Sequence, residues 1–197
     1  MSDIEDIAER SHELLTRLSG DYELETQLGF TVAQAVAGRV RGRFERVEGT
    51  ARLDGDDPSQ SSVQLTIRTD SIRTGNKRRD QHLCRSFLDT AGHPLATFSS
   101  TRVTRLEESA FRVAGLLTLR GVTKPVTLDL ELASGLRFHG ETTIDRRDWQ
   151  VVWNAPAEAW GLFVGYDVTV QVDVVATRRP RQAPSGPVVA GFETKGQ

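Results

Sequence analysis

The chain has 197 residues, with 25 Lys and Arg against 27 Asp and Glu and a formal net charge of −2 at pH 7. This balance excludes a global basic field of the kind that recruits nucleic acid or an anionic membrane. The length predicts one domain with short extensions. The one cysteine, Cys84, excludes an intrachain disulfide. No apolar run approaches the roughly 20 residues that span a bilayer.

The first residues predict an amphipathic helix over 1–20. Ile4, Ile7 and Leu14 form part of an apolar stripe at helical spacing, and Ser19-Gly20 ends the helix. Such a helix would pack on the domain or pair with a second copy in a homodimer. The segment is acidic and lacks the uninterrupted apolar core of a signal peptide, so we expect a cytoplasmic protein.

Alternation of apolar and polar residues with a period of two recurs along most of the chain and predicts β-strands. The predicted strands cover 22–35, 36–53, 63–69, 96–106, 111–120, 126–132, 136–145 and 168–174. Their short connections favour antiparallel pairing. Gly121 and Pro125 are expected in one hairpin turn, where a permissive φ and a fixed φ are needed.

Residues 71–98 interrupt the strand pattern. Thr74-Gly75-Asn76 is a turn signal, and Asn76 is expected to cap a short helix that continues to Ser86. Leu83 and Phe87, four residues apart, would share one face of this helix. We expect the helix to lie across one end of the sheet as a lid, with these two side chains towards the lumen entrance.

The same segment carries a family resemblance. The strings Ser71-Ile72, Arg79-Asp80-Gln81-His82-Leu83 and His93-Pro94, with the run 117–126 and the strand-end motif 145–149, resemble the YceI-like family. The resemblance covers 21–178 and implies an all-β fold, a lipocalin-like antiparallel barrel of about eight strands. It also implies a lumen that binds polyisoprenoid lipids. Residues 179–197, rich in Pro, Gly and polar residues, are expected to form a disordered tail.

An eight-stranded barrel has an interior that side chains either fill or leave open for one small ligand. Pattern alone favours a filled, dry core, and the resemblance favours an accessible apolar lumen. The candidate lumen residues are Phe30, Val32, Val40, Phe44, Val63, Leu65, Ile67, Val113, Leu117, Leu119, Val126, Leu128, Leu130, Val170 and Val172.

The sequence offers little support for catalysis. On a helix, His82 and Cys84 point about 200° apart, so the histidine is out of reach as a base for the thiol. Arg79, Asp80 and His82 are expected to anchor the lid to the barrel rim, with contact to a ligand headgroup as the alternative. The four histidines are scattered without the spacing of metal ligands, so no metal or other cofactor is expected.

These observations predict a protein without catalytic activity that binds, stores or transports a long-chain apolar lipid, isoprenoid or quinone-like, in a β-barrel lumen. Two alternatives stay open. One is an enzyme or redox accessory acting on an isoprenoid lipid, with Arg79, Asp80 and His82 as acid-base groups. The other is a filled barrel that serves only as an interaction module. Nucleic acid is not an expected partner, because the short basic stretch at 178–181 is too small for its recognition.

Overall fold

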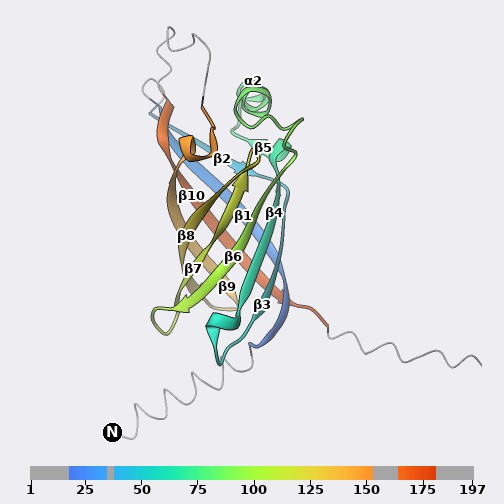
Figure 1. The fold of residues 1–197 in the computed structure, drawn as a ribbon, viewed down its shortest axis with the longest axis vertical. Helices are drawn as coiled ribbons and strands as arrows, with labels where there is room; N and C mark the ends of the chain where they lie inside the picture. Colours follow the sequence, from blue (N-terminus) through green and yellow to red (C-terminus); the bar gives the residue numbers. More distant parts are fainter. Residues whose placement is uncertain (1–17, 35–37, 153–163, 181–197) are drawn as a thin grey trace, which may run out of the picture.

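A computed structural model describes residues 18–34, 38–152 and 164–180 (Figure 1). The predicted N-terminal helix lies outside the described residues up to position 17, and Gly20 already belongs to the first strand. The predicted tail lies outside them from residue 181 onward.

Strands dominate the described chain. They are β1 (Gly20–Gln34), β2 (Gly38–Phe44), β3 (Val47–Leu53), β4 (Ser62–Arg68), β5 (Ile72–Arg73), β6 (Leu95–Arg105), β7 (Ala110–Leu119), β8 (Val122–Ala133), β9 (Arg137–Asp145) and β10 (Val164–Arg178). Between them lie the short helical segments η1 (Pro58–Gln60), η2 (Thr69–Ser71), α2 (Lys77–His82), η3 (Leu83–Phe87) and η4 (Arg146–Trp149).

All strand pairings are antiparallel, and the pairing of β10 with β1 closes the sheet into a barrel. Eight strands form the closed ring. β3 pairs with the first half of β1 and β2 with the second half, while the two-residue β5 extends β2. The all-β antiparallel barrel with one short helix is confirmed. Figure 1 shows α2 at one end of the barrel and η1 at the other.

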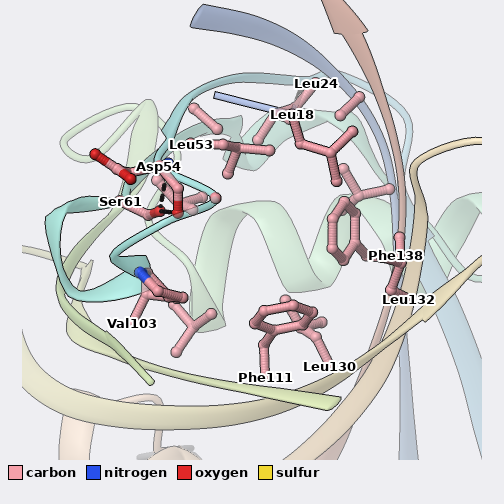
Figure 2. A pocket seen from close by; sticks show the side chains of 17 residues that line it. Leu18, Leu24, Leu53, Asp54, Ser61, Val103, Phe111, Leu130, Leu132 and Phe138 are labelled. Atoms are coloured by element: carbon pink, nitrogen blue, oxygen red, sulfur yellow. Dashed lines mark hydrogen bonds between the residues drawn. The ribbon is translucent and has the colours of Figure 1, made fainter. Parts of the chain in front are cut away.

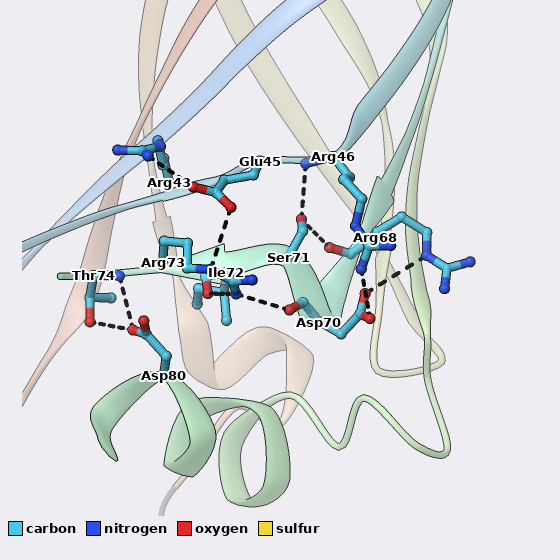
Figure 3. Close-up of polar contacts among 10 residues, drawn as sticks. All are labelled: Arg43, Glu45, Arg46, Arg68, Asp70, Ser71, Ile72, Arg73, Thr74 and Asp80. Atoms are coloured by element: carbon cyan, nitrogen blue, oxygen red, sulfur yellow. Dashed lines mark hydrogen bonds and ion pairs between the residues drawn. The ribbon is translucent and has the colours of Figure 1, made fainter. Parts of the chain in front are cut away.

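The strand predicted at 36–53 is divided between β2 and β3. Ser71 fixes this break: its Oγ accepts a hydrogen bond from the backbone N–H of Arg46 at 3.1 Å and donates one to the carbonyl of Arg68 at 2.6 Å. The N–H of Glu45 donates to the Ser71 carbonyl at 3.1 Å. The neighbouring strand breaks at the same level, between β4 and β5, so the two kinks support each other (Figure 3).

The ladder between β8 and β9 is incomplete. It ends at the pair Asp129 and Glu141, although β8 continues to Val122. Pro125 lies within this free edge, so its prediction as a turn residue was wrong. The turn is formed by Arg120 and Gly121, with φ of 50° and 74°. A proline on an unpaired edge loses no ladder hydrogen bond and opposes pairing with another strand.

Among the described residues, buried apolar side chains form two clusters inside the barrel. The central cluster includes the buried residues Tyr22, Leu28, Ile67 and Val172, and it reaches the η1 end of the barrel through Leu24, Ala51, Val174 and Ala176. A second cluster under η3 consists of Phe87, Trp149 and Val151, with further apolar side chains packed against it. The Trp149 indole N–H donates to the Leu117 carbonyl at 2.9 Å, which satisfies its one polar atom within this cluster.

Candidate functional site

An apolar cavity opens at the end of the barrel opposite α2. Its volume is about 100 Å³, and 17 residues line it (Figure 2). Those residues are Leu18, Leu24, Ala51, Leu53, Asp54, Gly55, Pro58, Ser61, Val63, Val103, Phe111, Val113, Leu130, Leu132, Phe138, Val174 and Ala176. They come from the β3–β4 loop and from the strand ends that surround it.

The cavity follows from the alternation along the strands. On β8, Leu130 and Leu132 line the cavity while Glu131 between them is exposed, because successive side chains point to opposite faces. Small side chains leave the space open. Ala51 and Ala176 are both buried and line the cavity from β3 and β10, on either side of β1.

Two polar side chains occur in the lining, and both are engaged within the β3–β4 loop. The Asp54 carboxylate accepts hydrogen bonds from the backbone N–H groups of Asp56 and Asp57, at 3.1 and 2.9 Å. The Ser61 hydroxyl accepts from the Asp54 N–H at 2.9 Å. These polar atoms stabilise the loop that forms one side of the mouth and leave the cavity wall apolar (Figure 2).

Three of the predicted lumen residues, Val63, Val113 and Leu130, line this cavity. The others are not among the residues that line it. Packed in or against the central cluster are Phe44, Leu65, Ile67, Leu119, Leu128, Val170 and Val172. Packed against the cluster under η3 are Leu117, Leu119 and Val126. Phe30, Val32 and Val40 lie nearer the α2 end. The centroid of the Phe30 ring is 5.9 Å from that of the Phe44 ring, and Val32 on β1 pairs with Val40 on β2.

Sequence reasoning missed most of the lining, including Leu24, Leu132, Phe138, Val174 and Ala176. The period-two pattern already placed such residues on the inner face. It carried no information on which level of the barrel is left open. The small inward residues Ala51 and Ala176 were the available signal.

The predicted rim residues Arg79 and Asp80 hold the start of α2 in place through Thr74. The Asp80 carboxylate accepts from the Thr74 N–H at 2.9 Å and from its hydroxyl at 2.6 Å. The Arg79 guanidinium donates to the Thr74 hydroxyl at 2.7 Å and to its carbonyl at 2.8 Å. Asn76 caps the helix as expected, by accepting from the Arg79 N–H at 3.1 Å. These contacts favour anchoring over contact with a ligand headgroup.

Leu83 and Phe87 point into the barrel from η3 and pack with Trp149. The His82 ring stands edge-on to Phe87, with the ring centroids 5.7 Å apart. Leu83 and Phe87 therefore cover the end of the barrel that lies opposite the cavity mouth. Their role as a lid on a ligand site stays a prediction.

Cys84 has the environment of a packing residue. Burial, reinforced by the negative charge of Asp70, raises the pKa of its thiol. A raised pKa disfavours the thiolate, the form that acts as a nucleophile. No cluster of three or more His, Cys, Asp or Glu side chains in the described part of the chain could hold a metal ion. None of the described helices is long and apolar enough to cross a membrane.

A family model described as the YceI-like domain matches residues 22–176. The chain belongs to the YceI-like family. A UPF0312 protein of Pseudomonas aeruginosa is 33% identical over 149 residues, which cover 68% of this chain and 78% of that protein. A UPF0312 protein of Pectobacterium atrosepticum is 38% identical over 120 residues, covering 56% of this chain. That match spans 62% of the Pectobacterium protein's own length.

Solved structures of other proteins share the fold. BcnA of Burkholderia cenocepacia superposes with a TM-score of 0.69 at 24% identity, covering 77% of this chain and 96% of BcnA. A polyisoprenoid binding domain from Saccharophagus degradans gives a TM-score of 0.62 at 17% identity, covering 80% of this chain and 98% of that domain. At these identities the likeness supports the barrel architecture and no further property.

Proposed function

We propose that this YceI-like protein binds the apolar chain of a lipid, isoprenoid or quinone-like, without catalysing a reaction on it. The observation that carries the proposal is the cavity at the η1 end, whose wall is apolar apart from two engaged polar side chains. Transfer of an alkyl or prenyl chain from water into such a site gains about 0.8 kcal/mol per buried CH₂. The description of the Saccharophagus domain as polyisoprenoid binding points in the same direction.

The size of the cavity limits what enters it. At about 100 Å³ it is smaller than the roughly 150 Å³ engineered cavity that takes up benzene in another protein. The cavity therefore takes the end of an apolar chain, and the remainder extends through the mouth. The central cluster, with Leu28, Ile67 and Val172 buried, forms the floor against which the chain ends.

The alternative of acid-base chemistry by Arg79, Asp80 and His82 has less support. Arg79 and Asp80 are engaged with Thr74, and both lie at the opposite end of the barrel from the cavity. A cytoplasmic location and pairing of two copies through the N-terminal segment remain predictions from the sequence.

Direct binding of a neutral probe with a linear isoprenoid chain, radiolabelled farnesol, tests the proposal. In Ala176→Phe, a ring added at a buried lining position occupies the cavity, so we expect probe binding to be lost. Thr177→Phe is the matched control, because residue 177 is the exposed neighbour on the same strand. Normal probe binding by a folded Ala176→Phe variant would refute binding in this cavity.

A further inference from the structure

The cavity holds less than the ligand that the proposed function assigns to it. Its volume is about 100 Å³, so the end of an apolar chain fills it and the rest of that chain passes the mouth. Five large apolar side chains of the lining are only half-buried, namely Leu18, Leu53, Phe111, Leu132 and Phe138. Contact of water with the emerging apolar chain opposes binding. A tight site therefore needs a further apolar surface that covers the mouth.

Leu18 joins the cavity to the first 17 residues of the chain. It lines the cavity (Figure 2) and is the first residue that the structure describes. Its carbonyl accepts a hydrogen bond from the Tyr22 hydroxyl at 2.7 Å. The neighbouring Ser19 accepts one at its Oγ from the Gly55 N–H, at 2.9 Å, and one at its carbonyl from the Arg178 guanidinium. The N-terminal segment therefore departs from a point that is fixed at the cavity.

The sequence of this segment places its apolar residues in phase with Leu18. At 3.6 residues per turn, the predicted helix carries four apolar side chains within about 60° of the direction of Leu18. They are Ile4, Ile7, Leu14 and Leu15, here called the N-terminal stripe. The carboxylates of the same helix fall about 120–180° away from Leu18, and they belong to Glu5, Asp6, Glu9 and Glu13. Because Leu18 lines the cavity, it sets the rotation at which the stripe faces the mouth.

From these observations we infer that the N-terminal stripe lies over the mouth and covers the part of the apolar chain that the cavity cannot hold. The occupant of this half-buried rim is thus a segment of the same chain, with its carboxylates towards water. The inference rests on the proposed function, since it concerns the same ligand. It makes the segment before Leu18 part of the binding site and extends that site beyond the barrel.

Two full-length double variants test the inference through binding of radiolabelled farnesol. Ile7→Gln with Leu14→Gln makes the stripe polar, whereas Glu9→Gln with Thr16→Gln introduces the same residues, with the same spacing, on the opposite side of the helix. We expect the stripe variant to bind farnesol about tenfold more weakly and to release it faster, and the control to bind as the wild type does. Thermal melting of the barrel should be unchanged in both, because all four positions precede β1.

The length of the ligand provides a second readout. Geraniol has one isoprene unit fewer than farnesol, so less of it emerges from the cavity. We therefore expect the stripe variant to lose more affinity for farnesol than for geraniol. Unchanged binding of farnesol, or equal losses for the two ligands, would overturn the inference and leave the proposed function standing. If neither the wild type nor the stripe variant binds farnesol, the proposed function itself is overturned.

The oligomeric state separates the segment of the same chain from that of a second copy. Sedimentation at the concentration of the binding assay should give one mass for the wild type and the stripe variant. A wild-type dimer that becomes monomeric in the stripe variant would assign the mouth to the stripe of a partner, and would overturn coverage by the same chain.

Discussion

Removing the apolar pair Leu83 and Phe87 tests whether the α2 end and the cavity are independent. Phe87 is only 5% exposed and packs with Trp149 and Val151. Truncation of a buried Phe to Ala costs about 3–5 kcal/mol, and the less deeply buried Leu83 adds a contribution near the lower end of the 2–5 kcal/mol range. The free energy of unfolding of a domain is about 5–15 kcal/mol. If the double substitution lowered the stability of the whole barrel by the sum of these amounts, much of the protein would unfold.

We expect the loss in Leu83→Ala with Phe87→Ala to be mainly local, because η3 contacts the barrel through a single cluster. Amide hydrogen exchange should show faster exchange first at the N–H groups of Leu88 and Thr90, which bond to carbonyls of η3 at 2.9 Å. Exchange in β1 and β10 should change less. Farnesol binding should be unaffected, because the cavity lies at the other end.

Leu116→Ala is the control for this double variant, since Leu116 is 42% exposed on the outer face of β7. It removes a similar apolar group without touching the cluster under η3. If amide hydrogen exchange in the double variant became faster by the same factor in all strands, a local role for η3 would be contradicted. Faster release of farnesol would show that η3 acts as the lid that the sequence predicted.

Three further predictions concern single side chains. The Thr26 hydroxyl oxygen is buried and has no hydrogen-bond partner among the described residues, so Thr26→Val should raise the free energy of unfolding in urea by about 1 kcal/mol, and a loss of stability would refute this. Because burial raises its pKa, the Cys84 thiol should react with Ellman's reagent more slowly at pH 7 than a free cysteine does, and Cys84→Ala should retain farnesol binding. Hydrogen bonds from Arg147 lower the pKa of Asp145 from 3.8 to about 2. Its carboxylate therefore adds stability above pH 4 that is lost as the pH falls towards 2, and acid titration of Asp145→Asn should show a smaller loss over that range.

The strand pattern was predictable from sequence because burial on one face imposes a period of two. The runs around Leu65 and Leu128 alternate cleanly, and both became strands of the barrel. The kink at Arg46 was missed because it depends on hydrogen bonds that the backbone N–H groups of Glu45 and Arg46 donate to Ser71, 25 residues from Arg46 in the chain. A local sequence pattern does not show which distant residue will accept these hydrogen bonds.

The level of the cavity could not be predicted for a related reason. Leu128 and Leu130 both point inward on β8, yet Leu128 packs against the central cluster and Leu130 lines the cavity. The difference arises from side chains of other strands at the same height, among them Ala51 and Ala176. A void depends on the summed volumes of residues far apart in sequence, which alternation does not encode.

Analysis of lipids extracted from the purified full-length protein tests the central claim most directly. Mass spectrometry of the extract should find a lipid with a long apolar chain, isoprenoid or quinone-like, near one molecule per protein, in the wild type and in Thr177→Phe. The extract of Ala176→Phe should lack it, because the added ring occupies the cavity. An equal amount of the same lipid in folded Ala176→Phe, or no lipid in any sample together with no farnesol binding, would contradict the account.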